Sequence, residues 1–152
     1  MNTRWSGRAR MVAIAVAGAV GVLAACAQMD ASIKAQETGQ QVRLEGSQEV
    51  PPVSTTAYGT GTINIMPDRT VTVTLSVVDM TPTAAHIHEG AKGANGPVIV
   101  PFTKISERSF VAPDNAKLTE AQYASYKAGN LYVNVHSAKN PGGEVRAQIV
   151  GR

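Results

Sequence analysis

The sequence lacks several features that mark common classes of enzyme and of secreted protein. It has one cysteine, Cys26, among 152 residues, so no disulfide can form within the chain. No serine lies in a nucleophile-elbow motif, and no glycine-rich loop has the phosphate-binding pattern. These absences argue against a serine hydrolase and a nucleotide-binding enzyme. Internal repeats are also missing, and the length suits one domain.

A surplus of charge of one sign is missing from most of the chain. The formal net charge is +3, but Arg4, Arg8 and Arg10 lie in an N-terminal segment that contains no acidic residue. The rest of the chain carries 11 basic and 11 acidic side chains. Binding to nucleic acid, or to an anionic membrane by bulk charge, needs a cluster of basic residues, so neither is expected.

The N-terminal segment is typical of an export signal. Its apolar run over residues 11–22, MVAIAVAGAVGV, is shorter than the about 20 residues of a membrane-spanning helix. The run leads into Leu23-Ala24-Ala25-Cys26, which resembles the bacterial lipobox, where cleavage precedes a cysteine that receives lipid. We therefore predict a lipoprotein signal peptide over 1–25 and a lipid anchor on Cys26. The alternatives are an ordinary secretory signal and a buried apolar helix.

The segment that follows, 26–41, is polar and lacks both aromatic residues and a sustained apolar period, so a solvated tether is expected. Ala27 and Gln28 follow the cysteine, without the aspartate that retains similar lipoproteins at the inner membrane. We therefore expect the protein in the cell envelope, at the outer membrane and facing the periplasm or the surface. Residues 42–152 are expected to form the globular domain.

This globular part has the pattern of short strands. Residues 70–77, TVTVTLSV, alternate apolar with polar side chains, as in a strand with one buried face. Segment 57–66 precedes it, and Pro67-Asp68 between the two favours a hairpin. Further short strands are expected at 97–102, 131–136 and 144–150. Without strand–helix–strand alternation, the pattern predicts an all-β antiparallel sandwich or barrel.

One short helix is expected to interrupt the strands. Thr119 and Gln122 have the spacing of a capping box, and Leu118 and Tyr123 flank them as a hydrophobic staple does. Gly129 can end the helix in a left-handed conformation. We expect this helix to cover one edge or end of the sandwich.

The three histidines are all predicted to lie on one face. His86 and His88 alternate with Ile87, so both imidazoles point away from the core, and His136 lies on the polar face of strand 131–136. Side chains two residues apart along a strand are about 6.6 Å apart and can converge on one ion. Three imidazoles with open positions suit copper or zinc. Such pairs also occur by chance, so histidines that only hydrogen-bond their neighbours stay an alternative.

The turn sequence at 140–143, NPGG, predicts that the last two strands pair. That pairing brings Arg146 near His136, with Glu144, Arg146 and Gln148 on the outer face. Glu49 and Glu89 could form a carboxylate pair, but nothing in the sequence sets their separation. Solvated surface acids are the commoner explanation for them.

Four ordered motifs resemble those of the CHRD (chordin-type) domain. They are LEGSQEVPPV at 44–53, TAAHIHEG at 83–90, GANGPVIV at 93–100 and LYVNVHSAKNPGGEVRAQI at 131–149. The resemblance covers about 42–151. It implies an extracytoplasmic, Greek-key-like β-sandwich similar in fold to Cu/Zn superoxide dismutase, in a family whose biochemical role is poorly defined.

The similarity to superoxide dismutase implies roles for individual residues. His86 and His88 resemble the His-x-His pair of its copper site, His136 resembles a later copper ligand, and Arg146 resembles the arginine that attracts the anionic substrate. The chain lacks the bridging fourth histidine, the zinc ligands and the disulfide cysteines. These departures argue against dismutase activity and are compatible with a mononuclear copper site.

Three functions follow from these observations. The first is a noncatalytic binding module of the cell envelope, with an unknown ligand or protein partner. The second is copper or zinc binding by His86, His88 and His136, with Arg146 attracting anions. Superoxide dismutation, the one enzymatic candidate, is the third and is disfavoured by the missing ligands.

Overall fold

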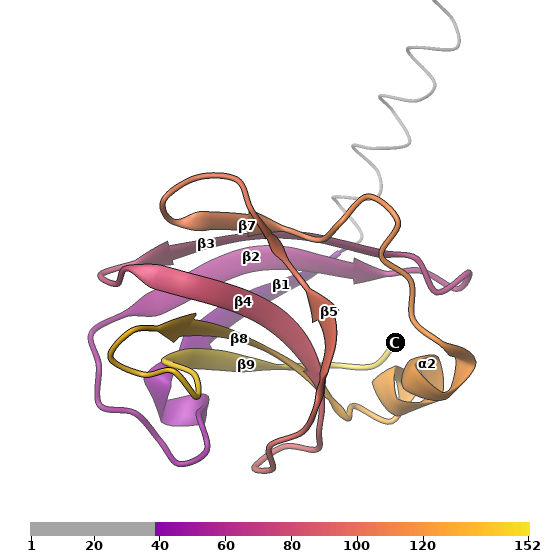
Figure 1. Ribbon diagram of the computed structural model, residues 1–152. Coiled ribbons are helices and arrows are strands. Elements are labelled where there is room, and N and C mark those ends of the chain that lie inside the picture. Colours follow the sequence, from indigo (N-terminus) through magenta and orange to yellow (C-terminus); the bar gives the residue numbers. More distant parts are fainter. Residues whose placement is uncertain (1–38) are drawn as a thin grey trace, which may run out of the picture. The chain divides into compact units, whose positions relative to one another are not determined.

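The computed structural model describes residues 39–152, which form a nine-stranded antiparallel sheet with one short α-helix in this part of the chain (Figure 1). The strands are β1 (Gln40–Glu45), β2 (Tyr58–Ile65), β3 (Val71–Val78), β4 (Pro82–Glu89), β5 (Val98–Pro101), β6 (Thr103–Lys104), β7 (Ser109–Val111), β8 (Leu131–Ser137) and β9 (Val145–Ile149). The helices are the 3-10 helix η1 (Gly46–Gln48) and α2 (Glu120–Lys127). The predicted signal peptide, Cys26 and most of the predicted tether lie outside the described residues. No helix in the described part is long and apolar enough to cross a membrane.

The sheet curls so that its two ends meet. The strand order is β5-β4-β8-β9-β1-β2-β3-β7-β6, and Phe102 alone separates the outermost strands β5 and β6 in the chain. The backbone therefore joins the two edges of the sheet, and Figure 1 shows β2 and β3 facing β4 and β8. Strands β3 and β4 are consecutive in the chain but far apart in the sheet, a crossover of the Greek-key kind. The predicted all-β, sandwich-like architecture is confirmed.

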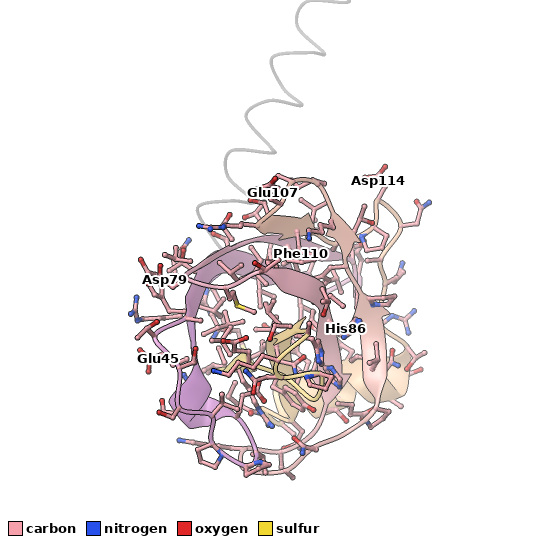
Figure 2. The ribbon with its side chains drawn as sticks, turned by 60° about the vertical axis from the view of Figure 1, so that its left-hand side comes forward. Glu45, Asp79, His86, Glu107, Phe110 and Asp114 are labelled. Carbon is pink, nitrogen blue, oxygen red and sulfur yellow. The ribbon has the colours of Figure 1, made fainter. Side chains whose placement is uncertain are left out.

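The interior of the curled sheet is the hydrophobic core, and the predicted alternation supplies it. On β3, Val71, Val73, Leu75 and Val77 are all at most 4% exposed, while the threonines between them face solvent. The predicted hairpin is also confirmed, because β2 pairs with β3 along its full length. Phe110 on β7 points into the same core (Figure 2).

The predicted helix begins and ends as its sequence indicates. Thr119 accepts a hydrogen bond from the backbone N–H of Gln122, and the Gln122 side chain accepts one from the backbone of Thr119, which completes the capping box. Gly129 follows the helix with φ of 75°, a left-handed conformation that suits glycine. The helix lies at one end of the curled sheet (Figure 1), with Tyr126 buried against the core.

The outer face of β4, β8 and β9, opposite the core, is polar but largely buried. Strand β8 pairs with both neighbours, so that Asn134 lies between His86 on β4 and Arg146 on β9. Both alternating sets of β8 side chains are buried, apart from His136, which is partly exposed. The loop 90–97 supplies part of this cover, because its carbonyl groups accept hydrogen bonds from Arg146 and His88. We call this covered surface the polar face.

Candidate metal centre

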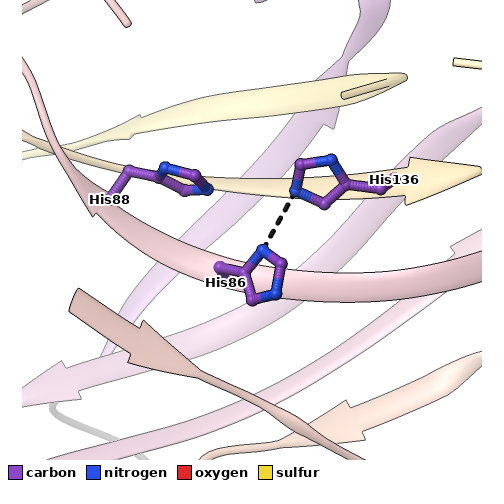
Figure 3. A group of neighbouring side chains, drawn as sticks. All are labelled: His86, His88 and His136. Atoms are coloured by element: carbon purple, nitrogen blue, oxygen red, sulfur yellow. Dashed lines mark hydrogen bonds between the residues drawn. The ribbon is translucent and has the colours of Figure 1, made fainter. Parts of the chain in front are cut away.

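The polar face brings the three predicted histidines together, as the alternation of β4 and β8 requires. His86 and His88 project from β4, and His136 projects from β8 beyond Asn134. Their nitrogens that could bind a metal lie within 4.8 Å of one another (Figure 3). We call these three side chains the histidine site.

The closest pair is already near the spacing that a metal ion imposes. His86 Nδ1 lies 3.0 Å from His136 Nε2. Two nitrogens bound to one tetrahedral ion at about 2.0–2.1 Å are about 3.3 Å apart. One ion can replace this hydrogen bond after small rotations of the rings, provided that the proton shared by the two nitrogens moves to His86 Nε2. His88 then offers a third nitrogen.

In two of the rings, a hydrogen bond to a backbone carbonyl determines which nitrogen keeps a lone pair for a metal ion. His88 Nδ1 lies 2.9 Å from the Gly96 oxygen, and His136 Nδ1 lies 3.0 Å from the Pro141 oxygen. Since a carbonyl oxygen only accepts, each Nδ1 carries the proton and each Nε2 keeps its lone pair. The Nε2 of His88 is buried and has no hydrogen-bond partner. This oriented arrangement is the one that metal-ligating histidines usually show.

Burial also keeps the imidazoles of His86 and His88 neutral. Burial and, to a smaller extent, the nearby rings of His136 and His88 together lower the pKa of His86 to about 4. Burial likewise lowers the pKa of His88, against the opposing effect of its hydrogen bond to Gly96. Both rings are therefore unprotonated at neutral pH, which is the state that binds metals.

Arg146 lies on the predicted face, but its side chain runs to Tyr132 and to the loop 90–97. Its guanidinium carbon is 3.4 Å from the centre of the Tyr132 ring, whose other neighbour is the stacked ring of His88. The guanidinium donates to the oxygens of Ala94 and Asn95, among others, and the residue is 1% exposed. The sequence predicts Arg146 close to His136, whereas its described hydrogen bonds all go to other residues. Its role in attracting anions stays a prediction.

The two carboxylates considered as a pair lie in different surroundings. Glu89 accepts a hydrogen bond from Ser125 of the helix, whereas Glu49 is 5% exposed and senses the charge of Arg146. Glu49 and Arg146 also line a surface cavity of about 540 Å³. The sequence favours a solvated surface acid at Glu49, because no periodic pattern marks the segment that carries it, whereas the structure buries this side chain.

Comparison with known proteins places the fold within one family. The family model of the CHRD domain matches residues 40–149. Comparison with curated proteins finds no match, and comparison with solved structures finds none. The similarity to superoxide dismutase therefore stays a prediction from the sequence.

Proposed function

The chain belongs to the CHRD domain family, and from this premise we propose that its domain is a noncatalytic binding module whose ligand is a transition-metal ion. His86, His88 and His136 are the proposed ligands. The observation that carries the proposal is the buried Nε2 of His88, which lacks a partner inside a cluster of imidazoles. Leaving a buried polar atom unpaired costs about 1–3 kcal/mol, and a bound ion removes that cost.

The ligand set favours particular metals. Three neutral imidazoles without a thiolate or a coordinating carboxylate suit copper and zinc, and divalent copper binds such nitrogen sites more tightly than zinc. A set of three ligands also leaves a position open for water or for a group from a partner. We therefore propose copper as the first ion and zinc as the second.

Metal titration of the purified chain without a histidine tag tests this function. We expect one Cu(II) or Zn(II) ion per chain by isothermal titration calorimetry. The variant His86→Ala/His136→Ala removes two of the three ligands, so its affinity is expected to fall more than about 100-fold. Lys139→Ala, an exposed change in the turn beyond His136, serves as control and is expected to bind normally. No stoichiometric binding, or equal binding by the double variant, would contradict the proposal.

We also propose that the module works in the cell envelope, anchored through Cys26. The support is the lipobox-like sequence before this cysteine and the lack of any other cysteine with which it could pair. Cys26→Ser is expected to abolish labelling by a fatty-acid analogue and to release the protein from the membrane fraction, whereas Ser32→Ala is expected to change neither. Continued sedimentation of the Cys26→Ser variant with membranes would count against the anchor.

A further inference from the structure

One acidic side chain, Glu49, is buried beside the histidine site. It follows η1 and is 5% exposed, and its Oε1 atom has no hydrogen-bond partner. The chain makes room for it at Gly143, where a Cβ atom would lie 2.6 Å from Asn134 Nδ2 and closer still to Glu49 Oε1. A carboxyl group is costly to bury, so its position here calls for a physical reason.

Asn134 connects this carboxyl group to the histidines. It lies opposite His86 in the sheet, is 2% exposed, and has an Oδ1 atom without a partner. Burial raises the pKa of Glu49 and lowers that of His88, and in both cases the side chain of Asn134 opposes the effect of burial. Asn134 therefore lies close enough to act on both groups. Glu49, Asn134 and His88 therefore form one buried polar chain in which each residue has an unpaired atom.

A divalent cation in the histidine site needs a compensating negative charge, and Glu49 can supply it. Three neutral imidazoles bring no negative charge to a divalent cation, and the positive charge of Arg146 already disfavours a charged His88. In a buried site, the repulsion between a bound cation and the guanidinium of Arg146 is only weakly screened. The charge of Arg146 favours the ionised form of Glu49, so an ionised Glu49 offsets the positive charge of Arg146 on this face.

We propose that Glu49, acting through Asn134, is the counter-charge of the histidine site and makes the site prefer divalent over monovalent ions. Glu49 is a positioning and charge-balancing residue and not a metal ligand. The inference rests on the proposed function, because it assumes that the histidines bind an ion. Burial raises the pKa of Glu49 to about 7, so the group ionises readily once a positive charge arrives nearby.

The charge of the bound ion provides the test. Glu49→Gln keeps the shape of the side chain and removes its charge. Zn(II) serves as the divalent probe and Ag(I) as the monovalent probe, at about pH 8, where Glu49 is ionised. We expect the affinity for Zn(II) to fall about 10- to 100-fold, which is typical when a residue that contacts the metal ligands, and not the metal itself, is replaced. A Coulombic effect scales with ion charge, so the affinity for Ag(I) is expected to fall only about 3- to 10-fold. Glu49→Asp, which keeps the charge, is expected to preserve the ratio of the two affinities.

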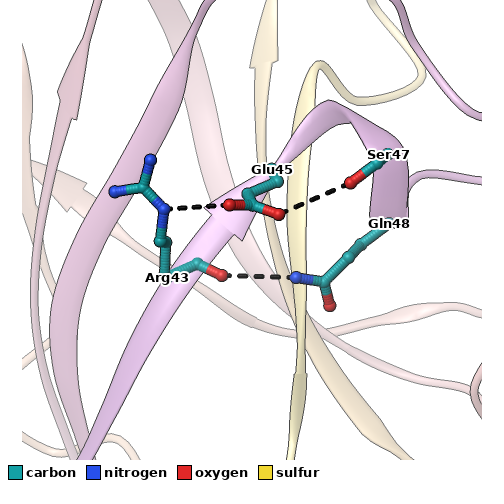
Figure 4. A network of polar contacts seen from close by, with 4 residues as sticks. All are labelled: Arg43, Glu45, Ser47 and Gln48. Carbon is teal, nitrogen blue, oxygen red and sulfur yellow. Dashed lines mark hydrogen bonds and ion pairs between the residues drawn. The ribbon is translucent and has the colours of Figure 1, made fainter.

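Glu45 offers a matched control on the same segment of chain. It lies in an exposed network at the end of β1 (Figure 4), made by Arg43, Glu45, Ser47 and Gln48. Glu45→Gln is therefore expected to leave both affinities unchanged. If Glu49→Gln binds Zn(II) as tightly as the wild type, or loses Zn(II) and Ag(I) affinity by the same factor, the counter-charge role is overturned and the histidine site stands. If the wild-type chain binds neither ion, both proposals fail.

Discussion

Replacing Arg146 by alanine is expected to lower the free energy of unfolding by about 3–5 kcal/mol. The side chain is 1% exposed, lies against the Tyr132 ring and donates to carbonyl oxygens of the loop 90–97. Its removal leaves a cavity, and the carbonyl oxygens lose their hydrogen-bond donors in a buried region where water cannot readily replace them. Urea denaturation followed by circular dichroism measures the loss.

The same change is expected to weaken the histidine site. The loop that Arg146 holds also supplies the Gly96 oxygen that orients His88. Loss of this orientation is expected to outweigh the removal of a nearby positive charge, so Zn(II) affinity should fall about tenfold or more. Arg108→Ala is the control, because Arg108 is exposed and its loss is expected to change stability by less than about 0.5 kcal/mol. An Arg146→Ala protein as stable as the Arg108→Ala protein would show that the loop is held by other contacts.

The parts of this fold that the sequence predicts are those with a local, periodic signal. The alternation in 70–77 identifies a strand with one buried face, and Pro67-Asp68 identifies its hairpin, because each signal is complete within a few residues. Thr119 and Gln122 identify the start of the helix for the same reason. The common face of the histidines also follows from the two-residue period of strands.

The burial of the polar face could not be predicted in this way. Alternation marks Tyr132, Asn134 and Arg146 as residues of the face opposite the core, and such a face is ordinarily exposed. Here irregular segments such as the loop 90–97 cover it, and Arg146 binds backbone carbonyls of that loop, which any sequence supplies. The position of Glu49 likewise depends on a contact with β8 that only the folded chain creates. The sequence therefore predicts that the three histidines lie together, but not which residues surround them.

A methyl group added at Gly143 is expected to lower the free energy of unfolding by about 2–4 kcal/mol, through strained backbone and overpacking. Gly143 has φ of 134°, which non-glycine residues rarely adopt, and its Cβ would meet Glu49 and Asn134. Gly142 is the matched control in the same turn, since a Cβ there meets no atom within 4 Å. Gly142→Ala is expected to leave stability unchanged or raise it by less than about 1 kcal/mol. Thermal and urea denaturation of the two variants measure the difference.

A double-mutant cycle separates the two causes of the Gly143 effect. Backbone strain at Gly143 and the contact with Asn134 are independent of Glu49, whereas the clash with the Glu49 carboxyl group disappears when that side chain is shortened. Gly143→Ala is therefore expected to cost less in a Glu49→Ala background, by about 1 kcal/mol or more. Additive effects would mean that the carboxyl group has room to move away from the turn. Coupling of this size would mean that Glu49 is confined beside Asn134, and a confined carboxylate is what a fixed counter-charge to the histidine site requires.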